Sequence, residues 1–267
     1  MKTEGVGAQG KLGGHHRLTG EFTPADFSEV IQHLPEHCPL VGGQAVAWWA
    51  SKYNVRIDPK GQRVAITSSD IDFWGTRDDL ISLARGLGRK PIFPHQYEMS
   101  VWAGAVPLYI KEKESLAEFL HTIPGLDTHD PERASFGQNY ASGAVVKTIQ
   151  VLTPVSLIYA KLHCLRNFDQ DGRDDEMHLR VCLAASRCFL NQIVSEAKIR
   201  MALWNIERLI AAHQFKPYKR LETQFRFNVL DGIPHDDILN HSTNPALDEA
   251  DRNRLSQFLN VRWKSLK

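Results

Sequence analysis

The sequence has few of the features that would place it in a specialised class of proteins. None of its apolar runs reaches the length of about 18 residues that a membrane-spanning helix needs. The first twenty residues are rich in glycine and contain no apolar run like that of a signal peptide. Only four cysteines occur in 267 residues, all without C-x-x-C spacing, so we expect buried, reduced thiols. We therefore expect a soluble cytoplasmic protein that has no membrane partner.

The chain also lacks a charge excess of either sign. Its 32 basic and 31 acidic residues leave a formal net charge of +1, which gives no global argument for binding nucleic acid or an anionic membrane. A balanced total charge is still compatible with a local basic patch on the surface. The hydrophobic fraction of 42% is that of an ordinary globular protein, and the length suits one large domain or two modest ones.

What is present is a change of character near residue 153. Before it, the sequence predicts strands at 39–41, 64–66, 71–73, 97–110 and 145–152, and helices at 24–34, 44–53 and 77–87. After it, helical periodicity dominates, broken by a polar loop at 169–172. We predict an α/β (α+β) domain with a mixed sheet at 21–153, preceded by a flexible arm at 1–20 and followed by an all-helical region at 154–267.

The first candidate site feature is a pair of glycines between a predicted strand and a predicted helix, in Val41-Gly42-Gly43-Gln44-Ala45. Glycines at such a corner let a phosphate approach the backbone, and the helix that follows offers unpaired N–H groups and a positive dipole end. Close packing alone explains many turns of this kind. The glycine pair therefore indicates a phosphate-binding site only in combination with a second feature.

That second feature is the segment Ser69-Asp70-Ile71-Asp72-Phe73. Residues two apart on a strand point to the same face, so Asp70 and Asp72 would project side by side. Their mutual repulsion is relieved by a hard divalent cation such as Mg²⁺ or Mn²⁺, which prefers oxygen ligands. Ser69 would touch phosphate or cap the end of the strand. The alternative is that both acids lie at a solvated strand end.

Together, the glycine corner in VGGQAVAWW and the acidic strand in TSSDIDFWG resemble the nucleotidyltransferase superfamily, which shares the fold of polymerase β. The resemblance is closest to the bacterial branch of abortive-infection toxins, proteins of toxin–antitoxin type. It implies a metal held by Asp70 and Asp72 and a nucleotide held at Gly42, Gly43 and Ser69. One departure is the long connection between the two motifs, in which residues 54–67 read as an inserted loop or hairpin.

The same resemblance extends to two later segments. LTPVSLIYAKL is similar to a helix that in this branch carries a lysine near the triphosphate, which implies a nucleotide-binding role for Lys161. Arg173-Asp174-Asp175 is similar to an element that closes the same helical region. The alternatives are that Lys161 extends to solvent from an amphipathic helix and that Arg173 pairs with Asp174.

Active members of the superfamily usually have a third acid on a neighbouring strand, and two positions compete for it. Glu118 precedes Phe119-Leu120 as the acid does in a related family, but the apolar residues around it also fit a helix with Glu118 on its surface. The rival strand at 145–152 has Gln150 instead, which binds metal poorly and cannot act as a base. We favour Glu118, and under the Gln150 alternative the site is inactive.

The resemblance implies an enzyme that transfers a nucleoside monophosphate from a nucleoside triphosphate, such as ATP, to an RNA, protein or small-molecule acceptor. Asp70, Asp72 and Glu118 would be its catalytic residues. The alternative is a catalytically inactive nucleotidyltransferase-like protein that binds a nucleotide or a partner. A third possibility is a helical interaction protein built on the region after residue 153. Basic residues interleave with aromatic ones in that region, a pattern compatible with RNA binding, at Lys216, Tyr218, Lys219, Arg220, Phe225 and Arg226.

Overall fold

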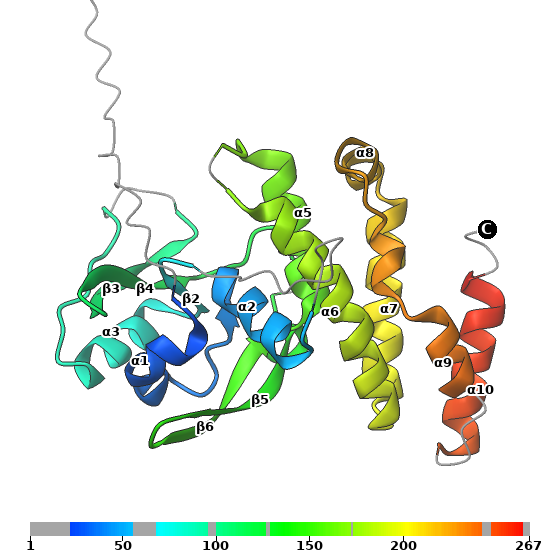
Figure 1. Ribbon diagram of the computed structural model, residues 1–267, viewed down its shortest axis with the longest axis horizontal. Helices are drawn as coiled ribbons and strands as arrows, with labels where there is room; N and C mark the ends of the chain where they lie inside the picture. Colours follow the sequence, from blue (N-terminus) through cyan, green and yellow to red (C-terminus); the bar gives the residue numbers. More distant parts are fainter. Residues whose placement is uncertain are drawn as a thin grey trace, which may run out of the picture.

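The fold is known from a computed structural model (Figure 1). It describes residues 22–55, 68–95, 100–126, 129–171, 173–241 and 247–263. The predicted arm at 1–20, the predicted strand at 64–66 and most of the predicted insertion at 54–67 lie outside these ranges. No helix in the described part of the chain combines the length and the apolar character that crossing a membrane requires.

A six-stranded sheet forms the centre of the α/β part. Its strands are β1 (Leu40–Val41), β2 (Ile71–Trp74), β3 (Trp102–Ile110), β4 (Lys113–Leu120), β5 (Ser135–Ser142) and β6 (Val145–Leu152), in the order β3-β4-β2-β1-β6-β5. β1 pairs parallel with β6 and β2 pairs parallel with β4, whereas the remaining pairs are antiparallel. The prediction of an α/β protein with a mixed sheet is therefore confirmed.

Helices lie before and between these strands, and some of them begin at start signals in the sequence. They are η1 (Pro24–Phe27), α1 (Ser28–His33), α2 (Gly42–Lys52), α3 (Arg77–Gly86) and α4 (Pro131–Ala134). Thr23 and Pro24 open the first of them as expected from the preference for a capping residue followed by proline. Thr76 opens α3, where its hydroxyl and the Asp79 carboxylate satisfy each other's backbone N–H groups.

All elements described after β6 are helical. They are α5 (Pro154–Asn167), α6 (Asp175–Ser195), α7 (Ile199–Gln214), α8 (Lys216–Phe225), η2 (Val229–Gly232), α9 (His235–His241), α10 (Glu249–Phe258) and η3 (Leu259–Trp263). Figure 1 shows α5 and α6 next to the sheet and α2, with α9 and α10 farthest away. This arrangement places the start of α6 within reach of the residues on β2 and α2.

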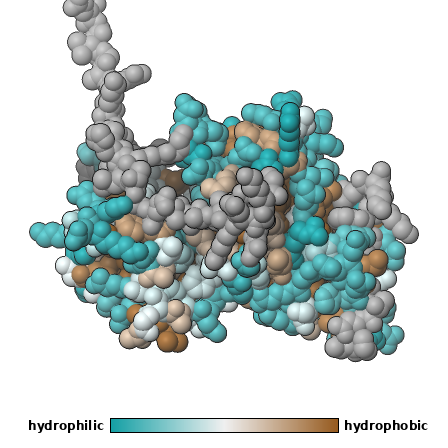
Figure 2. All heavy atoms as spheres, viewed as in Figure 1, coloured by the Kyte–Doolittle hydropathy of each residue, from teal (hydrophilic) through white to brown (hydrophobic). Residues whose placement is uncertain are grey.

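One hydrophobic core joins the sheet to these helices. Trp49 of α2 is fully buried, donates its indole N–H to the Leu152 carbonyl at 2.8 Å and contacts the ring of Phe189 from α6. Apolar residues of both regions belong to the same buried cluster. On the surface, Figure 2 shows mainly hydrophilic residues with small hydrophobic areas between them. The position of α6 against α2 is therefore fixed by packing.

The segment around Glu118 is a strand, so the helical alternative for it is wrong. In β4, Ser115, Ala117 and Phe119 are buried, whereas the residues between them are partly exposed. This is the alternation of a strand. The sequence pattern suggested a helix because two of the inward positions of the strand are occupied by the small residues Ser115 and Ala117, which do not stand out as apolar positions. β5 had no counterpart among the predicted strands, since its sequence SFGQNYAS contains few apolar residues.

Candidate functional site

Two of the three predicted acids are direct neighbours on adjacent strands. Asp72 on β2 lies opposite Glu118 on β4 in the parallel register of these strands. Glu118 contributes to the raised pKa of Asp72, so the two carboxyl groups are close enough to interact. Because neighbouring strands are about 4.8 Å apart, both side chains project into the same small volume. The structure thus places Glu118 beside Asp72.

Asp70 lies just before β2, and both of its carboxylate oxygens accept hydrogen bonds. Oδ1 accepts from the backbone N–H of Leu116 at 2.9 Å, and Oδ2 accepts from the hydroxyl of Ser69 at 2.7 Å. The first bond ties Asp70 to β4, the strand that carries Glu118. The hydroxyl of Ser69, which we predicted to contact the nucleotide or cap the strand, serves here to orient Asp70. Each oxygen keeps a lone pair for a cation.

The glycine corner packs directly against Asp72. Val41 is opposite Asp72 in the pairing of β1 with β2, and Gly42 follows it at the start of α2. A Cβ atom built on Gly42 would lie 1.8 Å from Asp72 Oδ2, and the φ angle of Gly42 is +64°. Only glycine fits there, both because of space and because of backbone conformation. The corner and the acid therefore form one site, in which the backbone of α2 starts beside a carboxylate.

The electrostatics of Asp72 reflect an excess of negative charge. Burial, followed by the charges of Glu118 and Asp70, raises the pKa of Asp72 from 3.8 to about 8. The Lys161 cation acts in the opposite direction and lowers this pKa. A carboxyl group whose pKa is raised by burial and by two neighbouring acids would ionise readily next to a divalent cation. The charge distribution is therefore one that a cation would stabilise.

Lys161 of α5 is held by an acid at the start of α6. Its Nζ donates to Asp175 Oδ1 at 2.8 Å, and Arg173 Nε donates to Asp175 Oδ2 at 2.6 Å. Asp175 is buried, and the two cations lower its pKa against the effect of its burial. The alternative that Arg173 pairs with Asp174 is wrong, because its described carboxylate partner is Asp175. Lys161 therefore does not extend to solvent but pairs with Asp175, and its charge also acts on Asp72.

His178 is a member of this region that the sequence analysis missed. Its side chain is buried, and neither ring nitrogen has a hydrogen-bond partner among the described residues. Burial and then the charge of Lys161 lower its pKa to about 3. Its Cε1 lies 3.6 Å from a Cβ atom built on Gly43. The signal that could have revealed it is its spacing of three residues from Asp175, which places both on one face of α6.

Two other residues lie away from the acids. Gln150 is on β6, which is separated from β2 by β1, and its amide oxygen accepts from the hydroxyl of Ser135 at 3.4 Å. Gln150 is therefore not on a strand next to Asp72. Arg166, on the last turn of α5, lies 5.9 Å from the ring centroid of Phe215 on the side of α8.

The donor set of the acid site fits a hard divalent cation, since Asp70, Asp72 and Glu118 offer only carboxylate oxygens. A tighter group of possible ligands lies elsewhere. His37, Cys38 and Asp79 are the one set among the described residues whose ligand atoms all lie within 4.8 Å of one another. The Asp79 carboxylate there already accepts from Thr76 and is bonded to His37 at 2.8 Å. This second group is thus explained by the start of α3.

Comparisons of the chain with protein-family models, with curated proteins and with solved structures find no match. The assignment of a function therefore depends on the chemistry of the side chains that the fold brings together. These are three carboxylates, a glycine corner, and a lysine bridged to a buried aspartate.

Proposed function

We propose that the protein is a metal-dependent nucleotidyltransferase that moves a nucleoside monophosphate from a nucleoside triphosphate to an acceptor. The observation that carries the proposal is the position of Asp72, which lies opposite Glu118 on the next strand and is packed against Gly42 at the start of α2. Paired carboxylates beside a helix N-terminus suit a substrate whose phosphates are bound together with a cation.

Asp70, Asp72 and Glu118 are the residues that would hold Mg²⁺ or Mn²⁺. When bound, the cation would neutralise phosphate charge and stabilise the pyrophosphate leaving group. The raised pKa of Asp72 supports this assignment, because burial and then the charges of Glu118 and Asp70 disfavour its ionised form in the absence of a cation.

The remaining residues position the substrate. The N-terminal turn of α2 at Gly42 and Gly43 offers backbone N–H groups to the phosphates. Lys161 contributes a positive charge toward the same space and is kept in place by Asp175. Glu118 accepts the proton of the acceptor hydroxyl. The hydroxyl oxygen then bonds to the α-phosphorus, the bond from the α-phosphorus to the bridging oxygen breaks, and pyrophosphate leaves.

The acceptor is an RNA, a protein side chain or a small molecule. For RNA, the basic side chains of α8 are the candidate contact surface. The interleaved aromatic residues contribute less than the sequence suggested, because Tyr218 is only 7% exposed and packs against Tyr159. Phe215, between α7 and α8, is 46% exposed, so a base of the RNA could stack on its ring.

The principal alternative is an inactive nucleotidyltransferase-like protein that only binds a nucleotide or a partner. That alternative depended on Gln150 as the residue in the place of the third acid. Glu118 beside Asp72 favours catalysis over it. The two functions predict the same metal-dependent binding and differ only in the release of pyrophosphate.

Two experiments on the purified full chain test the proposal. Isothermal titration with ATP, GTP, CTP and UTP, in MgCl₂ and in EDTA, measures metal-dependent binding. Incubation with α-³²P-labelled triphosphates and either total RNA, the protein itself or an aminoglycoside then measures transfer of label. Asp72→Asn is the test variant for both, and Gln150→Ala is the control that retains all three acids.

Binding that requires Mg²⁺, is lost in Asp72→Asn and leads to label transfer by the wild type and by Gln150→Ala would support the enzyme. Metal-dependent binding with no label on any acceptor and no pyrophosphate release would favour the inactive alternative. If the triphosphates bind equally well in EDTA and to Asp72→Asn, both nucleotide-based functions are wrong.

A further inference from the structure

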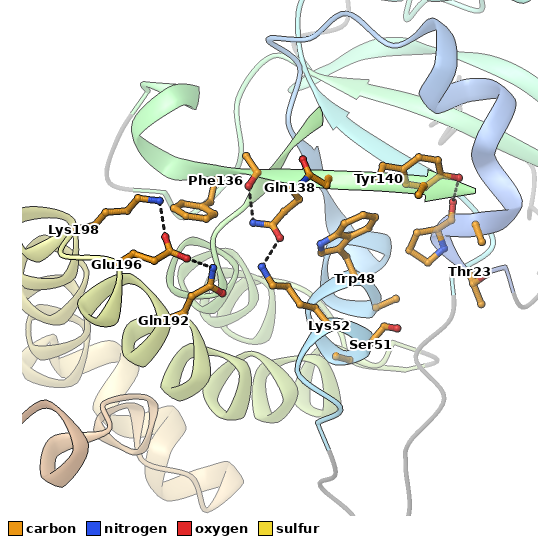
Figure 3. Close-up of a pocket in the computed structure, with 17 residues that line it drawn as sticks. Thr23, Trp48, Ser51, Lys52, Phe136, Gln138, Tyr140, Gln192, Glu196 and Lys198 are labelled. Carbon is orange, nitrogen blue, oxygen red and sulfur yellow. Dashed lines mark hydrogen bonds and ion pairs between the residues drawn. The ribbon is translucent and has the colours of Figure 1, made fainter. Parts of the chain in front are cut away.

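A large cavity lies away from the acid site, along the second half of α2. It has a volume of about 1130 Å³ and is bounded by α2, the edge strand β5, the end of α6 and the turn into α7. Figure 3 shows side chains from these elements around one space, with Thr23 at one end and Lys198 at the other. None of the three acids lines it. Its volume is slightly above the range of about 300–1,000 Å³ that is typical of small-molecule sites.

One wall of the cavity is aromatic. The rings of Trp48 and Tyr140 are stacked, with centroids 5.9 Å apart and an interplanar angle of 25°. Phe136 adds a third ring to the lining. The indole N–H of Trp48 is buried and has no partner among the described residues, whereas the neighbouring Trp49 donates to Leu152. A buried donor without a partner costs about 1–3 kcal/mol, so a nearby acceptor would be favourable.

Lys52 gives a second reason to expect a ligand with negative charge. Trp48 and Lys52 are four residues apart on α2 and therefore share a face of the helix. Lys52 Nζ donates to the neutral amide of Gln138 at 2.6 Å and lies over the rings of Trp49 and Tyr53. Burial lowers the pKa of Lys52, and Glu196 raises it. A partly buried cation whose hydrogen-bond acceptor is an amide would be stabilised by an anion.

The second cation of the cavity is already neutralised. Lys198 Nζ is paired with Glu196 at 2.6 Å and lies 4.4 Å from the centroid of the Phe136 ring. Glu196 would repel a ligand that carries many negative charges, such as a nucleic acid. The cavity thus combines aromatic surface with one cation that is available to a ligand.

We propose that this cavity binds a small organic anion that carries a flat ring. The ring packs against the Trp48–Tyr140 pair, and a carboxylate or phosphate group accepts a hydrogen bond from Lys52 Nζ in place of Gln138. The site is separate from the proposed transfer reaction and does not depend on it.

The test uses the purified full chain in EDTA, so that the acid site has no metal. The probes are AMP and 4-hydroxybenzoate, with adenosine and 4-hydroxybenzyl alcohol as their uncharged counterparts, followed by titration calorimetry and saturation-transfer NMR. Lys52→Met removes the charge but keeps the aliphatic chain over the rings. Lys90→Met, an exposed lysine elsewhere, and Asp72→Asn are the controls.

We expect at least one anionic probe to bind, and its affinity to fall about tenfold or more in Lys52→Met and for the uncharged counterpart. Both controls should bind as the wild type does. Preference for AMP would identify a nucleoside monophosphate as the ligand class, and preference for 4-hydroxybenzoate an aromatic acid. A second readout does not depend on how Lys52→Met folds. The indole N–H resonance of Trp48, assigned by its absence from the spectrum of Trp48→Phe, should shift in the wild type when the probe that binds is added.

The proposal is wrong if neither anion binds at millimolar concentration. It is also wrong if a charged probe binds no better than its uncharged counterpart, or if a probe is lost in Asp72→Asn but kept in Lys52→Met. The last result would place the probe in the acid site.

Discussion

Gly42 and Asp72 are so close that a Cβ atom on the glycine would lie 1.8 Å from Oδ2 of the aspartate. The glycine corner and the acidic strand were recognised as separate motifs in the sequence. In the fold they are in contact, because β1 and β2 pair with Val41 opposite Asp72. A side chain at position 42 would therefore displace the carboxylate that the proposed function requires.

Gly42→Ala should abolish nucleotide binding and transfer, since the added methyl group moves Asp72 away from Glu118. Gly88→Ala is a matched control: Gly88 has a φ angle of +63°, almost that of Gly42, but a Cβ atom on Gly88 would meet no described atom within 4 Å. Backbone strain alone costs about 1–2 kcal/mol. Chemical denaturation should show that loss for Gly88→Ala with normal activity, and a larger loss for Gly42→Ala. Equal behaviour of the two variants would contradict the steric explanation.

Glu118→Gln should reduce label transfer by about 100-fold or more, because it removes the proposed base while keeping the shape of the side chain. Binding of the triphosphate should fall much less. Gln150→Ala is the control at the rival position and should transfer label at the wild-type rate. If Gln150→Ala loses activity and Glu118→Gln keeps it, the third acidic position has been misassigned.

The parts of the site that follow local rules could be predicted from the sequence. Thr23 and Pro24 mark a helix start, and Asp70 and Asp72 flank an apolar residue in a strand, because both patterns involve residues close in the chain. The partner of Asp72 could not be assigned in this way. Its identity depends on which strand pairs with β2, a long-range choice between the strands of Glu118 and Gln150.

The helical part of the site was harder still. Lys161 and Asp175 lie on different helices, and their pairing depends on how α5 packs against α6. His178 was missed because its spacing of three residues from Asp175 indicates a shared helix face but does not show that the imidazole is buried without a hydrogen-bond partner. Side-chain pairs between helices follow from packing, which the sequence pattern does not specify.

Asp175→Asn should destabilise the protein strongly. Asp175 is buried and bonded to both Lys161 and Arg173, so its removal leaves the buried lysine without its charge partner. Breaking a buried pair from one side costs about 3–5 kcal/mol. The control is Asp174→Asn, the exposed neighbouring acid, which should change the free energy of unfolding by less than about 0.5 kcal/mol. Denaturant titration at pH 7 measures both, and similar losses would show that the Lys161–Asp175 pair is not the cause.

His178 should make the stability of the protein depend on pH in mildly acidic solution. Its pKa is about 3 in the folded chain and about 6.5 when unfolded, so between these values the unfolded state binds the extra proton. Stability is therefore complete above pH 6.5 and decreases as the pH falls toward 3, by an upper bound of roughly 4–5 kcal/mol. His178→Leu should flatten the decrease measured by denaturant titration between pH 7 and pH 4.

The control for this measurement is His121→Gln, which removes an exposed imidazole and should leave the pH dependence as in the wild type. Because Lys161 contributes to the low pKa of His178, Lys161→Met should reduce the decrease without removing it. A decrease that persists unchanged in His178→Leu would mean that other groups cause the loss of stability in acid. Such a result would contradict the expectation that protonating His178 is costly, which rests on its burial beside Gly43 and on its lack of hydrogen-bond partners among the described residues.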